Sequence, residues 1–286
     1  MKIDFHVHIT PPDIIANWEK YADKEPYFAE LCGSKNNKFA SAEDVIGAYK
    51  WADEQSGDVF AFDKVVVFGF AFRDMGLCRY VNDYVIEKVK QYKNRLVGFM
   101  VVSPSDDAAD KEVERCAGAG LKGVGELFPS GQLFDPENDR DMTRLCRACG
   151  EFNLPLLIHA NEPVGHYYPG KTDMSLKRFA TFVKKNQELS IILAHWGGGL
   201  LFYETMREIG DCFRNVYYDT AATPFLYDAR IYRAAIALGL ERKIIFGSDF
   251  PLLPPSRYFD DIEAGGLSAE EKMMIFGGNA AKLLKI

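Results

Sequence analysis

Histidine is scarce in this sequence, since 286 residues contain only five, and other features are missing altogether. No run of about 18 uncharged apolar residues occurs, so we expect no transmembrane helix and no membrane partner. The opening residues lack the apolar run and cleavage site of a signal peptide, which predicts a cytoplasmic protein. Basic residues (34) are fewer than acidic ones (41), and the net charge of −7 argues against nonspecific nucleic-acid binding.

The six cysteines would allow three disulfides, but thiols in a cytosolic protein of this size are usually reduced. Cys146 and Cys149 form a CxxC inside a helical pattern, without a second CxxC or a nearby histidine. We interpret this pair as structural, and a redox or zinc role is the alternative.

What the sequence does contain is a series of short apolar runs with helical segments between them. These runs predict eight strands: Lys2–Ile9, Lys64–Phe72, Leu96–Ser103, Leu121–Phe128, Leu154–Asn161, Ser190–Trp196, Val216–Thr220 and Lys243–Asp249. Several are apolar almost throughout, which is typical of parallel strands buried on both faces. The predicted fold class is therefore α/β, with a (β/α)8 TIM barrel as the preferred architecture and a doubly wound open sheet as the alternative. We expect residues 1–286 to form a single domain.

Two helix starts and one unusual loop can also be predicted. Ser41 is placed to cap a helix over Val45–Ala52, and Ser268 begins a capping box before a last helix over Lys272–Lys285, which two glycines should interrupt. The segment Thr10–Asp63 is about twice as long as the usual βα spacing and contains several aromatic residues. We interpret it as an elaborated loop inserted over the barrel mouth, because long loops of this kind are usually functional; a surface excursion without a role is the alternative.

The first predicted strand carries two of the five histidines. His6 and His8 are two residues apart and therefore share one face of a strand, together with Asp4. The apolar residues between and around them are expected to face the helices: Ile3, Phe5, Val7 and Ile9. Two imidazoles on one face can bind one divalent ion, although two hydrogen-bonded histidines without a metal would give the same pattern.

Three more polar residues end later strands. His159 ends the fifth strand, His195 the sixth and Asp249 the eighth. In a barrel these carboxyl ends converge on one mouth, where active sites lie. Buried imidazoles are more stable there as neutral ligands than as cations, so we predict a metal site.

Further candidates surround this site. Glu126 ends the fourth strand and could bind a second ion, support a ligand or simply end the strand. Arg73, after the second strand, could bind a substrate carboxylate or pair with its neighbour Asp74, and Asn161 is a second candidate for substrate binding. The loop Glu162–Thr172 is predicted to contact substrate, and its His166 is not expected to bind metal.

Taken together, these motifs resemble the amidohydrolase superfamily. The HxH on the first strand, His159, His195 and Asp249 follow its pattern, and the phrases around residues 194–199, 246–251 and 278–284 look like its amidohydrolase-2 branch, which includes aminocarboxymuconate-semialdehyde decarboxylase. The resemblance implies a metal-dependent (β/α)8 barrel with His6, His8, His159 and Asp249 as zinc ligands. It implies that His195 is catalytic in one-metal members and a ligand in two-metal members. Glu126 departs from the carboxylated lysine of many binuclear members and is similar to the TatD-type nucleases.

These residues leave four functional hypotheses. The first is hydrolysis of a small amide, lactone or ester that carries a carboxylate, with Asp249 moving the proton of the attacking water and His195 hydrogen-bonding the water or the oxyanion. The second is nonoxidative decarboxylation of an aromatic or muconate-like acid, the third a phosphodiesterase, and the fourth a metal-binding scaffold without activity. One or two divalent ions are expected, with zinc as the first choice over manganese, iron or cobalt. A homodimer is a further hypothesis about the assembly of the chain.

Overall fold

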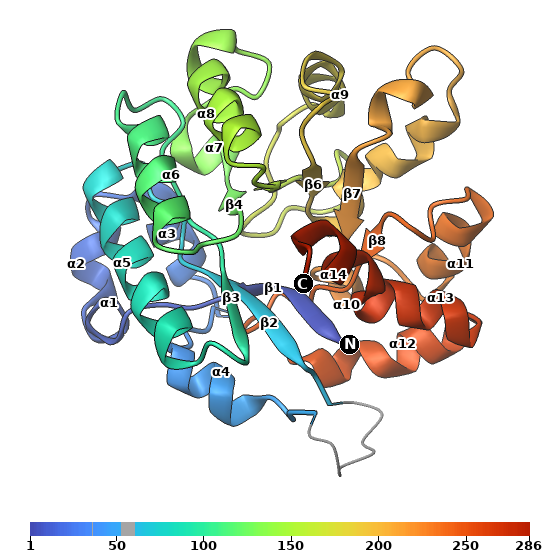
Figure 1. Cartoon of the computed structure of the whole chain (residues 1–286), viewed down its shortest axis with the longest axis horizontal. Coiled ribbons are helices and arrows are strands. Elements are labelled where there is room, and N and C mark those ends of the chain that lie inside the picture. Colours follow the sequence, from blue (N-terminus) through green and yellow to red (C-terminus); the bar gives the residue numbers. More distant parts are fainter. Residues whose placement is uncertain (36, 53–60) are drawn as a thin grey trace.

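The computed structural model describes residues 1–35, 37–52 and 61–286 and shows eight parallel strands surrounded by helices (Figure 1). All eight predicted strands are present, and each is shorter than predicted. They are β1 (Ile3–His8), β2 (Lys64–Phe68), β3 (Leu96–Gly98), β4 (Val124–Leu127), β5 (Leu156–Ile158), β6 (Ile191–Leu193), β7 (Val216–Asp219) and β8 (Ile244–Ile245).

The strands follow one another in chain order around a barrel. Strands β1, β2 and β3 form one hydrogen-bonded sheet in that order, and β4 to β8 form a second one in chain order. All neighbouring strands within the two sheets are parallel. Single parallel bridges connect these two groups, Met100 with Val124 on one side and Val7 with Phe250 on the other. The predicted (β/α)8 barrel is therefore confirmed, and the carboxyl ends of its strands meet at one mouth.

Helices cover the outside of the barrel. The described residues between β1 and β2 form four short ones: α1 (Pro12–Ala16), α2 (Trp18–Ala22), α3 (Pro26–Cys32) and α4 (Ala42–Ala48). The later helices are α5 (Met75–Gln91), α6 (Ala109–Gly118), α7 (Pro129–Gln132), α8 (Asp139–Glu151), α9 (Leu176–Lys185), α10 (Thr223–Leu226), α11 (Arg230–Ala237), α12 (Phe259–Ala264), α13 (Ala269–Met273) and α14 (Asn279–Leu284). Shorter turns are η1 (His195–Thr205), η2 (Gly210–Phe213), η3 (Pro255–Tyr258) and the π-helical η4 (Met274–Gly278).

The predicted helix starts are present. Ser41 and Ser268 each form a capping box, at the beginning of α4 and α13. The last helix is interrupted at η4, where Gly277 leaves the helical conformation, as the two glycines predict. The CxxC lies in α8 with both thiols buried and free, and burial raises the pKa of Cys146 to about 12, which supports its structural interpretation.

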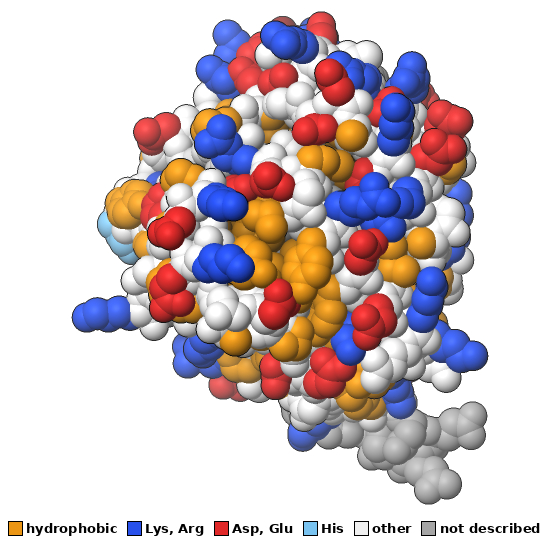
Figure 2. All heavy atoms as spheres, turned by 90° about the vertical axis from the view of Figure 1, so that its left-hand side faces the viewer, with side chains coloured by type: hydrophobic (Ala, Val, Ile, Leu, Met, Phe, Trp, Pro, Cys, Tyr) orange, Lys and Arg blue, Asp and Glu red, His pale blue; other side chains and the backbone are white. Residues whose placement is uncertain are grey.

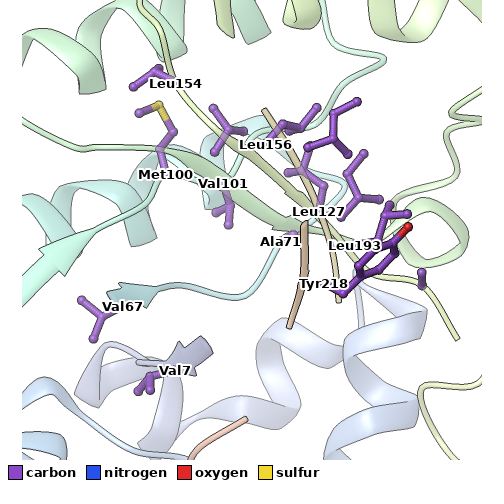
Figure 3. Close-up of a cluster of buried hydrophobic side chains, with 14 of the residues drawn as sticks. Val7, Val67, Ala71, Met100, Val101, Leu127, Leu154, Leu156, Leu193 and Tyr218 are labelled. Atoms are coloured by element: carbon purple, nitrogen blue, oxygen red, sulfur yellow. The ribbon is translucent and has the colours of Figure 1, made fainter. Parts of the chain in front are cut away.

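The core consists of two clusters of buried side chains. The larger one packs the outer faces of the strands against the helices and includes Val7, Val67, Leu127, Leu156 and Leu193 (Figure 3). The smaller one consists mainly of strand residues such as Val66, Phe99, Leu157 and Ile192, and fills the barrel interior. Burial of both clusters fixes the strand ends on which the polar residues lie.

An irregularity in β1 changes which of its side chains face inward. Asp4 pairs with Val65 and Val7 pairs with Val67, so three steps along β1 match two along β2. A bulge of this kind interrupts the alternation of side chains.

The prediction for the faces of β1 is consequently wrong at its amino-terminal end. Ile3 and Phe5 belong to the interior cluster, whereas Val7 and Ile9 pack toward the helices as expected. Asp4 does not accompany His6 and His8; it accepts hydrogen bonds from the Tyr49 hydroxyl (2.7 Å) and the Ser248 amide (2.9 Å).

The surface in Figure 2 is the side of the molecule that carries α1, α2 and α5. Basic and acidic side chains are interspersed there around a small group of hydrophobic ones, so this face presents no continuous basic patch of the kind that nucleic acids need. Among the described residues, no helix is both long enough and apolar enough to cross a membrane.

Candidate metal centre

Four side chains at the barrel mouth form a compact set of metal donors. His6 Nε2 lies 3.3 Å from His8 Nε2 and 3.6 Å from Asp249 Oδ1, and the latter two atoms are 3.4 Å apart. Glu126 Oε2 is 3.4 Å from His6 Nε2 and 3.6 Å from His8 Nε2. Ligands that each lie about 2.1 Å from one tetrahedral ion are about 3.4 Å apart, so His6, His8 and Asp249 have the spacing of three ligands to one divalent ion, and Glu126 Oε2 lies at the same spacing from the two histidines.

A second donor set lies on the other side of Glu126. Its Oε1 atom is 3.0 Å from His159 Nδ1 and 3.4 Å from His195 Nε2, and the two ring nitrogens are 3.2 Å apart. These three donors also have the spacing of ligands to one ion, and they leave a fourth tetrahedral position open. Glu126 thus offers one oxygen to each set.

The backbone of β4 explains why Glu126 points into the barrel. Val124 pairs with Leu156 and Leu127 pairs with Ile158, so a second bulge lies at residues 125 and 126. Gly125 has a φ of +120°, and a Cβ atom there would lie 2.1 Å from the Leu157 carbonyl oxygen. Only glycine fits this position, and it allows the bulge that aims the carboxylate inward.

Hydrogen bonds behind the histidines fix which ring nitrogen is available. His6 Nδ1 donates to Asp219 (2.8 Å), and His195 Nδ1 donates to the Ala221 carbonyl (3.0 Å). His159 Nε2 donates to the Gly170 carbonyl (3.0 Å). Because each acceptor requires a protonated nitrogen, the other nitrogen of each ring presents its lone pair to the donor sets.

Asp219 is a site residue that the sequence analysis missed. It is fully buried at the end of β7. The carboxylate oxygen that does not bond His6 accepts hydrogen bonds from the backbone amides of His195 (2.8 Å) and Ala221 (3.0 Å). The pattern that identified Asp249, an aspartate closing an apolar strand, was also present here.

Both carboxylates of the donor sets are ionised at neutral pH. Burial opposes the ionisation of Glu126, but the charges of His6 and His159 hold its pKa well below the ordinary value. Burial likewise opposes the ionisation of Asp249, but a hydrogen bond from His8 and the charge of His6 lower its pKa to about 2. The positive charges that lower these pKa values stand where a divalent cation would be held, and such a cation would supply the same compensation with the imidazole rings neutral.

The backbone of two donors is also unusual. His195 has a φ of 55° and Asp249 a φ of 61°, in the left-handed region that residues other than glycine rarely adopt. Such conformations cluster at functional sites, where surrounding packing holds them in place.

The remaining predicted residues lie outside the donor sets. The Arg73 side chain is exposed at the rim and has no partner among the described residues, while its backbone amide donates to the buried Glu25. Asn161 uses its side chain to hold its own loop, bonding both the amide and the carbonyl of Thr172. His166 is exposed and belongs to neither set.

A closed ring of strands with two sets of nitrogen and oxygen donors at its carboxyl end defines a metal-dependent barrel enzyme. The chain belongs to the amidohydrolase family, whose profile matches residues 3–286. The resemblance found in the sequence is thereby confirmed. A search of curated proteins gave no match.

Solved structures with the same fold include two decarboxylases and a probable hydrolase. The chain is similar to 5-carboxyvanillate decarboxylase from Sphingomonas paucimobilis (17% identity, TM-score 0.70, covering 100% of this chain and 99% of that one). It is also similar to a dihydroxybenzoic acid decarboxylase from Polaromonas with bound manganese (19%, 0.70, 99% and 96%). A third is a probable 2-pyrone-4,6-dicarboxylic acid hydrolase from Acinetobacter baumannii (16%, 0.64, 100% and 99%). The chain is therefore a metal-dependent enzyme of the hydrolase and decarboxylase class, and the donor chemistry supports a divalent ion.

Proposed function

We propose that this chain is a hydrolase that uses two divalent ions, with zinc as the first choice, to hydrolyse a small amide, lactone or ester carrying a carboxylate. The observation that carries this proposal is the second donor set, Glu126, His159 and His195, which offers three ligands and one open position. Catalytic metal sites keep a position open for water or substrate, whereas structural sites are closed. The same ligand types also suit manganese, iron and cobalt.

The chain's own residues provide the proton transfers that such a reaction needs. Bound divalent ions would lower the pKa of a water molecule and polarise the substrate carbonyl. Asp249 is ionised and beside both His6 and His8, so it can accept the proton of the water and pass it to the leaving group. His195, whose Nδ1 donates to the Ala221 carbonyl, keeps its Nε2 lone pair available as a ligand of the second set and so holds the ion beside the open position.

Arg73 is proposed to bind the substrate carboxylate at the rim of the mouth. Its guanidinium group is exposed, and a planar guanidinium can bind a carboxylate through two parallel hydrogen bonds. Asn161 would have to break its bonds to Thr172 before it could bind substrate, so its proposed contact is the weaker of the two.

Decarboxylation of an aromatic acid is a second candidate, favoured by aromatic rings beside the donors. The ring of Phe128 lies 4.1 Å from that of His159, and Tyr27 stacks on Phe128 at 4.0 Å. A planar substrate could extend this stack, and solved decarboxylases share the fold.

The two candidates differ in their products, which makes them separable. The protein is purified without a chelating tag, loaded with zinc or manganese, and tested on dihydrocoumarin, 4-nitrophenyl acetate, bis(4-nitrophenyl) phosphate and 2,6-dihydroxybenzoate. We expect hydrolysis of the lactone or ester, loss of metal and activity together in His8→Ala, and retention of metal in the matched variant His166→Ala. Full activity of a metal-free His8→Ala protein contradicts the proposal, and carbon dioxide release without any hydrolysis selects the second candidate.

A further inference from the structure

One aromatic side chain from the segment between β1 and β2 reaches the metal centre. Tyr27 lies on α3, and its ring stacks almost parallel on Phe128, with an interplanar angle of 16°. Phe128 follows Glu126 by two residues and contacts the ring of His159. A Cβ atom on Gly131 would lie 2.4 Å from the Tyr27 ring and 2.6 Å from the Phe128 ring, so the backbone of α7 packs closely against both rings. The position of this ring is therefore fixed by packing.

The Tyr27 hydroxyl has no hydrogen-bond partner among the described residues, although the side chain is half-buried. Other tyrosines of this region do have partners: Tyr21 bonds Asp13, Tyr167 bonds Glu30 and Tyr168 bonds Glu162. A phenol that lacks a partner in a partly buried position loses free energy unless some other group accepts its proton.

The Tyr27 hydroxyl lies beside the loop that holds His159, because a Cβ atom on Gly170 would lie 3.6 Å from its oxygen and the Gly170 carbonyl accepts a hydrogen bond from His159 Nε2 (3.0 Å). Burial raises the pKa of the Tyr27 phenol well above its ordinary value, and the charges of Glu126, Glu30 and Asp249 raise it further. The hydroxyl therefore keeps its proton at neutral pH and is available as a donor. The stack on Phe128 and the position of the hydroxyl beside Gly170 place it on the side of the second donor set, where a bound ligand could accept its hydrogen bond.

We propose that the Tyr27 hydroxyl donates a hydrogen bond to the substrate oxygen that gains negative charge at the metal centre. Tyr27 is then a catalytic residue supplied by the segment between β1 and β2, and the ring stack on Phe128 holds its hydroxyl in position. The inference rests on the proposed hydrolysis, because that reaction generates such an oxygen at a tetrahedral carbon.

The test uses methylphosphonate, a tetrahedral oxyanion that needs no turnover to bind. Its dissociation constant is measured by calorimetry on the zinc-loaded wild-type protein, on Tyr27→Phe and on Tyr80→Phe. Tyr27→Phe keeps the stacked ring and removes only the hydroxyl, whereas Tyr80 bonds the exposed Asp13 and serves as the matched control. Metal content per chain is measured on all three proteins.

We expect Tyr27→Phe to bind methylphosphonate about 10- to 100-fold more weakly, the range for one hydrogen bond to a charged group, with unchanged metal content. Tyr80→Phe should bind like the wild type. Equal affinity of Tyr27→Phe and wild type overturns the inference, and so does loss of metal in Tyr27→Phe, which would give Tyr27 a structural role. Absence of methylphosphonate binding to the wild type also overturns it. Failure of hydrolysis alone would leave these binding results intact and would count against the proposed reaction only.

Discussion

Asp219 connects the two donor sets without belonging to either. One of its carboxylate oxygens accepts a hydrogen bond from the ring nitrogen Nδ1 of His6, and the other accepts hydrogen bonds from the backbone amides of His195 and Ala221. A single buried carboxylate thus orients a ligand in the first set and the strand end that carries a ligand in the second.

We predict that Asp219→Asn weakens metal binding by about 10- to 100-fold, the range found when such supporting partners are changed. The oxygen of the asparagine side chain can still accept hydrogen bonds from the backbone amides, but its NH2 group cannot accept a hydrogen bond from His6 Nδ1. Metal affinity is measured by competition with a chelator, and Asp228→Asn, an exposed aspartate, is the control. An unchanged affinity in Asp219→Asn would show that His6 does not need this partner.

Gly125 is the residue that permits the inward position of Glu126. An alanine there would place its Cβ atom 2.1 Å from a backbone oxygen at a φ of +120°. We predict that Gly125→Ala lowers the free energy of unfolding by at least about 1–3 kcal/mol, the usual magnitude of such strain, and reduces metal content. Gly47 lies in α4 with open space around it, so Gly47→Ala should raise stability by about 0.5–1 kcal/mol. Urea unfolding measures the free energy of unfolding of both variants. Equal values for Gly125→Ala and Gly47→Ala would contradict the prediction.

Among the elements, α5 and α6 are joined to the segment after β3 through a buried polar network. Asn82 bonds both the amide and the carbonyl of Val101 and donates to Glu112 (2.9 Å), which also accepts two hydrogen bonds from Arg115. Burial opposes the ionisation of Glu112, but these hydrogen bonds lower its pKa below the ordinary value. The network therefore stabilises the ionised carboxylate.

Because the folded state depresses this pKa, the stabilisation is present above the unfolded value, about 4.3, and is lost as pH falls through the folded value. We predict that Glu112→Gln lowers the free energy of unfolding at pH 7 by about 1.5–3 kcal/mol and removes this part of the acid sensitivity. Urea unfolding at pH 7 and pH 4 measures both effects, with the exposed neighbour Glu114→Gln as control. An acid sensitivity equal to that of the wild type would contradict the assignment.

The sequence predicted the elements better than the directions of their side chains. Burial on both faces makes a strand visible as an apolar run, so all eight strands could be found. The bulges at Asp4–Val7 in β1 and at Gly125–Glu126 in β4 depend on pairing with neighbouring strands, which periodicity within one strand does not reveal. The face of Asp4 was mispredicted for this reason.

At the site, the donors could be predicted because they end strands whose ends must converge. Tyr27 could not, since its approach to Phe128 depends on how α3 packs, and neither could the engagement of Asn161 with Thr172. The grouping of the donors into two sets likewise required distances, because a place at the end of a strand does not tell which of the converging donors share one ion.

At the scale of the whole molecule, the barrel brings together donors that are up to 243 positions apart in the chain, from His6 to Asp249. Five strand ends contribute a donor to the site, and a sixth, β7, contributes Asp219. Closure of the barrel between β8 and β1 is what sets Asp249 beside His6 and His8. Metal binding should therefore depend on the complete fold.

The number of divalent ions per chain decides whether both donor sets hold a metal. It is measured by elemental analysis on protein purified without a chelating tag, for the wild type and for His195→Ala, which removes a donor from the second set only. Two donor sets bridged by Glu126 predict about two ions per wild-type chain and about one in His195→Ala. One ion per chain in both proteins would contradict the account.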